Sequence, residues 1–110
     1  MHTSETKFFF ALPNEILTKD IEAFTRKAVE IIELYAKKNK DYGNAFHASF
    51  IKWGIMYLLS RLDDKLNRLT TITKNGSTAV TEESVKDTLM DIAAYALMGL
   101  VELEKQNETV

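Results

Sequence analysis

Residues 81–106 have the pattern of a helix that is apolar around most of its circumference. At about 100° per residue, one side of this helix carries Val85, Leu89, Ile92, Ala96, Leu100 and Leu103. The other side carries Met90, Ala94, Leu97, Met98 and Val101. Such a helix must be buried on more than one side, and a chain of 110 residues has few other elements to surround it. We therefore expect the second side to pack against another subunit, in a homodimer or a larger closed assembly.

Two further segments predict long helices. Residues 20–39 have one apolar face and, on the other side, oppositely charged i,i+4 pairs such as Glu22/Arg26. Glu30 and Glu33 lie on that charged side, which favours a solvated surface over a metal site. Residues 45–72 contain no proline, and large apolar residues recur there at alternating intervals of four and three, at Ile55, Leu59, Leu62, Leu66 and Leu69.

The breaks expected between these helices are short. Gly43 interrupts the helical pattern, and Asn44 can cap the helix that follows. Residues 74–79 predict a turn, after which Thr81 can cap the third helix. The sequence thus predicts an all-α fold of three long helices in an antiparallel bundle, with the third helix shared in an oligomer interface. It divides into an N-terminal arm (1–17), a single helical domain (18–106) and a tail (107–110).

Composition and charge exclude several classes of function. No apolar run approaches the ~18 residues of a membrane span, and the aromatic patch at residues 8–12 lacks the basic lead of a signal peptide, so we expect a cytoplasmic protein. The absence of cysteine excludes disulfides, zinc–thiolate sites and thiol catalysis. A formal net charge of -2 argues against bulk nucleic-acid binding, which needs a basic surface.

Three carboxylates lie above one another on the third helix. They belong to Glu83, Asp87 and Asp91, and Tyr95 lies one turn further on. Carboxylates in this arrangement can hold Mg²⁺ together with the phosphates of a substrate. They can equally form ion pairs with basic residues of the second helix, and the sequence leaves both interpretations open.

The second helix carries basic residues on the side away from its leucines. Tyr57, Arg61, Asp64 and Arg68 share this side, with Lys65 beside them. The planar fork of an arginine suits a bound phosphate, whereas a local Asp64–Arg68 ion pair is the structural alternative. His47, in the first turn of this helix, has no partner in the sequence that would suggest a metal site or a catalytic triad, so we expect it at the surface or in packing.

The segment between the first two helices offers a candidate nucleotide platform. Asn39, Asp41 and Tyr42 supply an amide, a carboxylate and an aromatic ring, and the helix N-terminus that follows has free amides for an anion. A capped turn with Tyr42 packed on the core fits the same residues.

Three stretches of the chain together resemble a known family. They are KNKDYGNAF at residues 38–46, WGIMYLLSRLDDKLNRL at 53–69 and VTEESVKDTLMDIAAYALMGLVELE at 80–104. They resemble the nucleotide modification associated domain 1 family, small helical proteins common in bacteriophages. The resemblance implies a phage or prophage context, in the cytoplasm of a bacterial host, and a link to modified nucleotides.

A more distant similarity is to the all-α nucleotide pyrophosphohydrolases. In that family Glu-x-x-Glu on one helix and Glu-x-x-Asp on the next cage Mg²⁺. This chain departs from that arrangement, because Glu30 and Glu33 lie on the charged side of their helix and the second motif is Glu-x-x-x-Asp-x-x-x-Asp.

The leading functional hypothesis is an oligomeric protein that captures a phosphorylated nucleotide, for instance to sequester a signal of host defence. Tyr42 would stack on the base, basic residues of the second helix would bind phosphate, and Asp87 or Asp91 would bind ribose, base or Mg²⁺. One alternative is a Mg²⁺-dependent nucleotide pyrophosphohydrolase or an accessory enzyme of nucleotide modification. Another is a structural oligomer whose buried ion pairs define its register.

Overall fold

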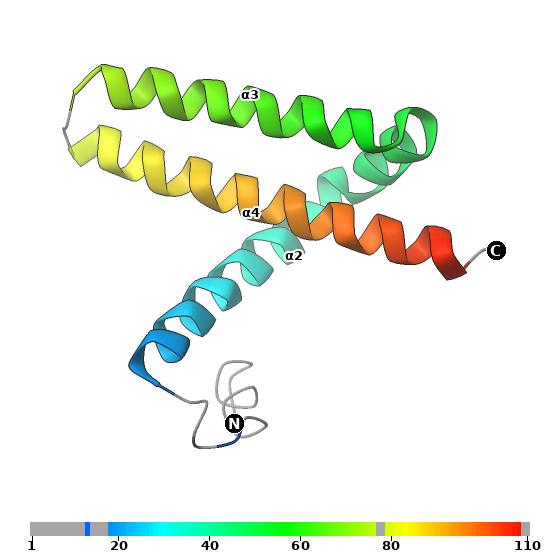
Figure 1. The fold of residues 1–110 in the computed structure, drawn as a ribbon, viewed down its shortest axis with the longest axis horizontal. Coiled ribbons are helices and arrows are strands. Elements are labelled where there is room, and N and C mark those ends of the chain that lie inside the picture. The colour runs from blue at the N-terminus through cyan, green and yellow to red at the C-terminus, as the bar shows by residue number, and fades with distance from the viewer. Residues whose placement is uncertain (1–12, 14–17, 77–78, 109–110) are drawn as a thin grey trace. The chain divides into compact units, whose positions relative to one another are not determined.

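The computed structural model describes Pro13, residues 18–76 and residues 79–108, without the side chains of residues 40–44, 79 and 80. These residues form three α-helices, α2 (Lys19–Trp53), α3 (Ile55–Lys74) and α4 (Ala79–Glu108), and no strand (Figure 1). The predicted all-α class is therefore confirmed. Apart from Pro13, the predicted arm lies outside the described residues. None of the helices in the described part of the chain has the length and hydropathy that a membrane span requires.

The chain divides into two compact units, residues 1–38 and residues 39–110. In the first unit, α2 begins at Lys19 because Thr18 caps it: the Ile21 amide donates to Thr18 Oγ1 at 3.2 Å. Lys27 Nζ lies 3.3 Å from Glu30 Oε2, and Glu33 is exposed, in agreement with the predicted charged side.

The first predicted break is wrong, because α2 continues through Gly43 and ends at Trp53. The chain turns at Gly54, whose φ of 66° and ψ of -150° lie in a region almost confined to glycine. The Gly54 amide donates to the carbonyl of Phe50 at 2.7 Å, and the Tyr57 amide donates to the carbonyl of Gly54 at 3.1 Å. A glycine inside a helix costs only about 1 kcal/mol relative to alanine, so the helix can pass Gly43.

The second break is where the sequence places it, although α4 begins two residues before the expected cap. α3 ends at Lys74 and α4 starts at Ala79, so Thr81 lies in the first turn of the helix. α3 and α4 then lie side by side as a helical hairpin (Figure 1).

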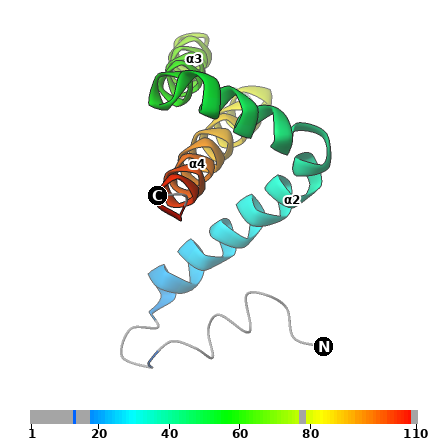
Figure 2. The ribbon, with the colours of Figure 1, turned by 90° about the vertical axis from the view of Figure 1, so that its right-hand side faces the viewer.

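The hydrophobic core of the second unit lies where the end of α2 meets this hairpin. Phe46, Phe50 and Leu58 are buried, and four partly buried residues pack on them, Tyr57, Leu62, Tyr95 and Met98. Figure 2 shows the change of direction between the last turns of α2 and the start of α3. Met98, which we expected on the second side of α4, packs partly buried against this core, whereas Leu97 and Val101 of the same side are 48% and 45% exposed.

Leu58 of α3 packs closely against α4 at Gly99. A Cβ atom placed on Gly99 would lie 2.5 Å from Cδ2 of Leu58, so a side chain there would require the Leu58 side chain to shift. The predicted leucine stripes contribute less to the contact than expected, since Leu59 and Leu66 of α3 and Leu100 of α4 are at least half exposed. Packing of all three helices in one antiparallel bundle stays a prediction.

We predict that Gly54→Ala destabilises the protein by about 1–3 kcal/mol, because the new side chain meets no atom within 4 Å and the cost is backbone strain alone. Chemical denaturation followed by circular dichroism measures this change in the free energy of unfolding. Gly43→Ala is the matched control and should leave the free energy of unfolding unchanged or raise it by up to about 1 kcal/mol. Equal destabilisation by both variants would contradict the assignment of the break to Gly54.

Candidate functional site

Arg61 of α3 and Tyr95 of α4 join the two helices on one side of the hairpin. Arg61 Nη2 donates to the Tyr95 hydroxyl at 3.4 Å, and the guanidinium lies 5.6 Å from the centre of the Tyr95 ring. The hydrogen bond to Tyr95 raises the pKa of Arg61 above its ordinary value, against the opposing effect of burial. Arg61 Nη1 also lies 3.2 Å from Asp64 Oδ2. The guanidinium is thus held in place by both helices.

A second pair lies one turn further along α3. Lys65 Nζ is 3.1 Å from Asp91 Oδ2, and the two side chains are only 22% and 26% exposed. This is the kind of ion pair that the sequence offered as the alternative to a metal site. Asp64, in contrast, pairs with Arg61 and not with Arg68, so the predicted Asp64–Arg68 pair is wrong.

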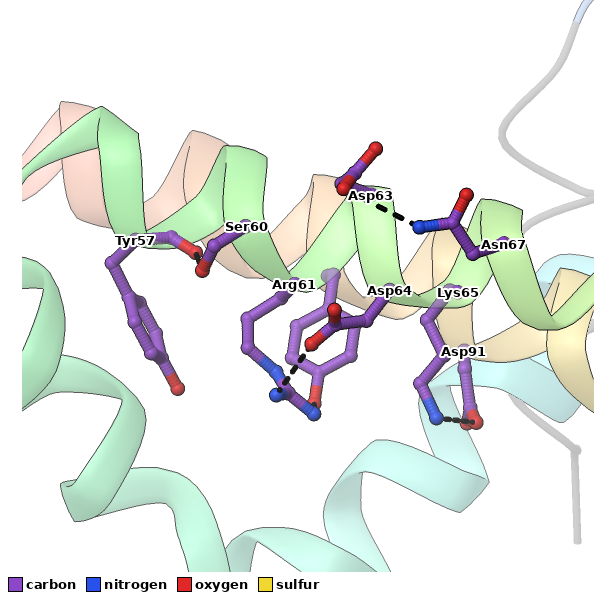
Figure 3. A network of polar contacts seen from close by, with 9 residues as sticks. Tyr57, Ser60, Arg61, Asp63, Asp64, Lys65, Asn67 and Asp91 are labelled. Atoms are coloured by element: carbon purple, nitrogen blue, oxygen red, sulfur yellow. Dashed lines mark hydrogen bonds and ion pairs between the residues drawn. The ribbon is translucent and has the colours of Figure 1, made fainter.

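The basic residues of α3 form a line with an aromatic ring at one end. Tyr57, Arg61, Lys65 and Arg68 follow one another at intervals of four, four and three, which places them on one face of the helix. Figure 3 shows the side chains of Tyr57, Arg61 and Lys65 on one side of α3, with those of Asp63 and Asn67 turned away from it. We call this line, together with Asp91 and Tyr95, the polar face.

Two members of the polar face differ from the rest in their surroundings. The Tyr57 ring packs edge-on against Phe46, with the ring centres 5.4 Å apart, so the core fixes its position. Arg68 is exposed and has no ion pair among the described residues. The polar face therefore combines a fixed ring, two restrained cations and one cation that is available to a ligand.

The other predicted site residues lie elsewhere. Glu83 and Asp87 are exposed on α4, and Asn39 is exposed on α2. Within the part of the chain that the structure describes, no three acidic or histidine side chains come together as metal ligands. The side chains of Asp41 and Tyr42 lie outside the described residues.

Sequence reasoning missed a pair formed by His47 and Glu102. His47 Nδ1 lies 2.7 Å and 2.9 Å from the two carboxylate oxygens of Glu102, and the Glu102 side chain is only 5% exposed. Burial by itself would raise the pKa of Glu102, but the hydrogen bonds from His47 and Lys105 outweigh burial and hold that pKa below its ordinary value. Because an ionised carboxylate only accepts, the His47 ring nitrogen must carry the proton in this hydrogen bond.

The only signal for this pair in the sequence is an acid at position 102 inside an apolar stretch of α4. Its partner is 55 residues away in the sequence, on a different helix. No spacing rule connects residues so far apart.

Comparison with known protein families assigns the chain to one of them. Residues 38–103, more than half of its length, match the family described as nucleotide modification associated domain 1. The chain belongs to this family. The match lies almost entirely within the second unit and contains the whole polar face, which places the hairpin and its ion pairs in the part shared with the family. No curated protein and no solved structure matches the chain.

We predict that Glu102→Gln lowers the free energy of unfolding by roughly 1–2 kcal/mol at neutral pH, because it removes the charged partner of His47 and Lys105. A lowered pKa in the folded state stabilises the protein above the ordinary glutamate pKa of ~4.3. This stabilisation is lost as the pH falls through the lower value of the folded state. The difference in melting temperature between wild type and variant should therefore narrow below about pH 4.

Glu104→Gln is the matched control, since Glu104 is an exposed glutamate on the same helix. It should leave the melting temperature and its pH dependence nearly unchanged. A difference between wild type and Glu102→Gln that persists undiminished to pH 2.5–3 (about 1.5 units below the ordinary pKa) would contradict the charged pair.

Proposed function

We propose that this chain is a homo-oligomeric protein that binds a phosphorylated nucleotide on the polar face of its α3–α4 hairpin. The observation that carries the proposal is the line of Tyr57, Arg61, Lys65 and Arg68 on α3, since it offers an aromatic ring followed by three cations in one direction. A nucleotide presents an aromatic base and a chain of phosphates in the same order. Membership of a family associated with nucleotide modification supports the same class of ligand.

The restraint of the cations favours binding. Arg61 is held by Tyr95 and Asp64, and Lys65 by Asp91, so these side chains lose little conformational freedom when a phosphate arrives. The guanidinium of Arg61 contacts Asp64 through Nη1 and Tyr95 through Nη2. A bound phosphate would displace the exposed Asp64 carboxylate, and its oxygens would accept the hydrogen bond from Arg61 instead. Arg68 needs no such exchange with any residue that the structure describes, because it forms no ion pair with them.

Capture is favoured over catalysis in this proposal. Among the described residues, Glu83, Asp87 and Asp91 are not gathered as metal ligands, and Asp91 pairs with Lys65, so the proposal does not rely on a Mg²⁺ site. We therefore assign no catalytic step to a metal, and hydrolysis of the nucleotide is the alternative that the experiment below can detect. In a bacteriophage, capture without turnover would withdraw a nucleotide signal of host defence.

We predict that nucleotides raise the melting temperature of the wild-type protein and that the matching nucleosides do not, since the phosphates supply the contacts to the cations. A panel of nucleoside mono-, di- and triphosphates and cyclic dinucleotides, each with and without Mg²⁺, tests this by thermal shift and calorimetry. Arg68→Gln should weaken binding roughly tenfold, the value of one charge-assisted hydrogen bond.

Lys74→Gln is the control, because Lys74 is an exposed lysine of α3 outside the polar face. It should bind like the wild type. Ligand recovered intact after heat release supports capture, whereas products whose formation stops in Asp91→Ala would show an enzyme. If no nucleotide of the panel stabilises the protein, the proposal of nucleotide binding is contradicted. The ion pairs would then have the structural role considered above.

A further inference from the structure

The side of the hairpin opposite the polar face carries exposed apolar residues, with the exposed Asp63 of α3 beside them. Ile55, Leu59 and Leu66 of α3 are 48%, 50% and 52% exposed. On α4, Leu89, Leu100 and Leu103 are 50%, 62% and 42% exposed. We call these six residues, with the exposed Ala96 between them, the leucine face.

The position of the leucine face follows from helix geometry. Leu59 lies two residues from both Tyr57 and Arg61, which is about 200° around the helix. Leu89 has the same offset from Asp91, and Leu100 the same offset from Glu102. Because the pairs Arg61–Tyr95 and Lys65–Asp91 join the helices on the polar side, both leucine stripes lie on the other side of the hairpin.

We propose that a second copy of this chain covers the leucine face, so that two hairpins form a four-helix bundle. The first argument is periodicity. On α3 the stripe recurs at intervals of four, three and four through the half-buried Leu62, and on α4 it continues from Ala96 through Leu100 to Leu103 at intervals of four and three. These are the intervals at which helices pack against other helices along their whole length. A hairpin supplies two helices of such a bundle, and a second hairpin supplies the other two.

The second argument is area. α3 has 20 residues and is therefore about 30 Å long, and two helices side by side are about 20 Å wide. The face of one hairpin thus measures roughly 600 Å², and two copies would bury at least about 1,200 Å², which reaches the range of stable protein interfaces.

The third argument is the shape of the stripes. The stripe of α4 has a small residue, Ala96, between Leu89 and Leu100, whereas the stripe of α3 has only large residues. Large side chains of one copy can fill the space above Ala96 of the other, as interdigitating helices require.

The inference goes beyond the proposed function by naming the surface through which two copies associate. It rests only on the homo-oligomeric part of that proposal.

The experiment is to replace one leucine of this face by a charge and to measure mass in solution. Wild-type protein should be dimeric at micromolar concentration by light scattering and analytical ultracentrifugation. Leu59→Glu should raise the dimer dissociation constant by roughly 100-fold or more, since a buried carboxylate without a partner is strongly unfavourable. Its helix content by circular dichroism should stay that of the wild type, because Leu59 is half exposed within its own chain.

Ile51→Glu is the control, because Ile51 is an exposed apolar residue of α2 outside the leucine face. It should remain dimeric. The absence of cysteine from the chain allows a second readout. The thiol of Leu66→Cys should react slowly with a maleimide, and at least about tenfold faster when Leu59→Glu is added, since the charge opens the interface.

A wild-type protein that is monomeric at micromolar concentration would overturn this inference, and so would a dimer that survives both Leu59→Glu and Leu100→Glu. Protection of Leu66→Cys in a monomer would show that another segment of the same chain covers the face, which also overturns it. Thermal shift by nucleotides in the same samples separates the two proposals, because the polar face lies within one chain and monomeric Leu59→Glu should still bind.

Discussion

The close packing of Leu58 of α3 against α4 at Gly99 is one of the contacts that join the two helices of the hairpin. Arg61 contacts Tyr95, and Lys65 contacts Asp91, between the same two helices. These pairs in turn hold the cations of the polar face. The same two helices bring Tyr95 and Met98 onto the core cluster of Phe46 and Phe50, so the core and the candidate site are built on one pair of helices.

The hairpin is two-sided as a result. One side presents aromatic and charged groups that are partly restrained by their neighbours, and the other presents aliphatic side chains at helical intervals. The two sides call for different partners: an anionic ligand with an aromatic ring suits the first, and another helical surface suits the second. Because the two sides are separate, the proposed ligand binding and the proposed self-association would use different residues.

Periodicity predicted the three helices well, because the spacing of apolar residues is a local property. Periodicity was less reliable for the position of the first break. The sequence offers a glycine at both Gly43 and Gly54, and only Gly54 adopts a backbone conformation that requires glycine. The basic residues of α3 were predicted as candidate site residues from their shared side, which local geometry determines. The individual partners of these basic residues were not predicted. Asp91 and Tyr95 lie on α4, and the sequence of neither helix alone determines how α4 is aligned along α3.

The amino-acid sequence by itself determined the all-α class, the number of long helices in the described chain, the family, and an apolar surplus on the third helix. Only the tertiary structure decided which surfaces carry that surplus. It placed Met98 in the core and left Leu59 and Leu100 exposed, and it paired His47 with Glu102 across 55 residues. The physical reason is that helix formation follows local spacing, whereas the face that a helix buries depends on how its neighbouring helices pack against it.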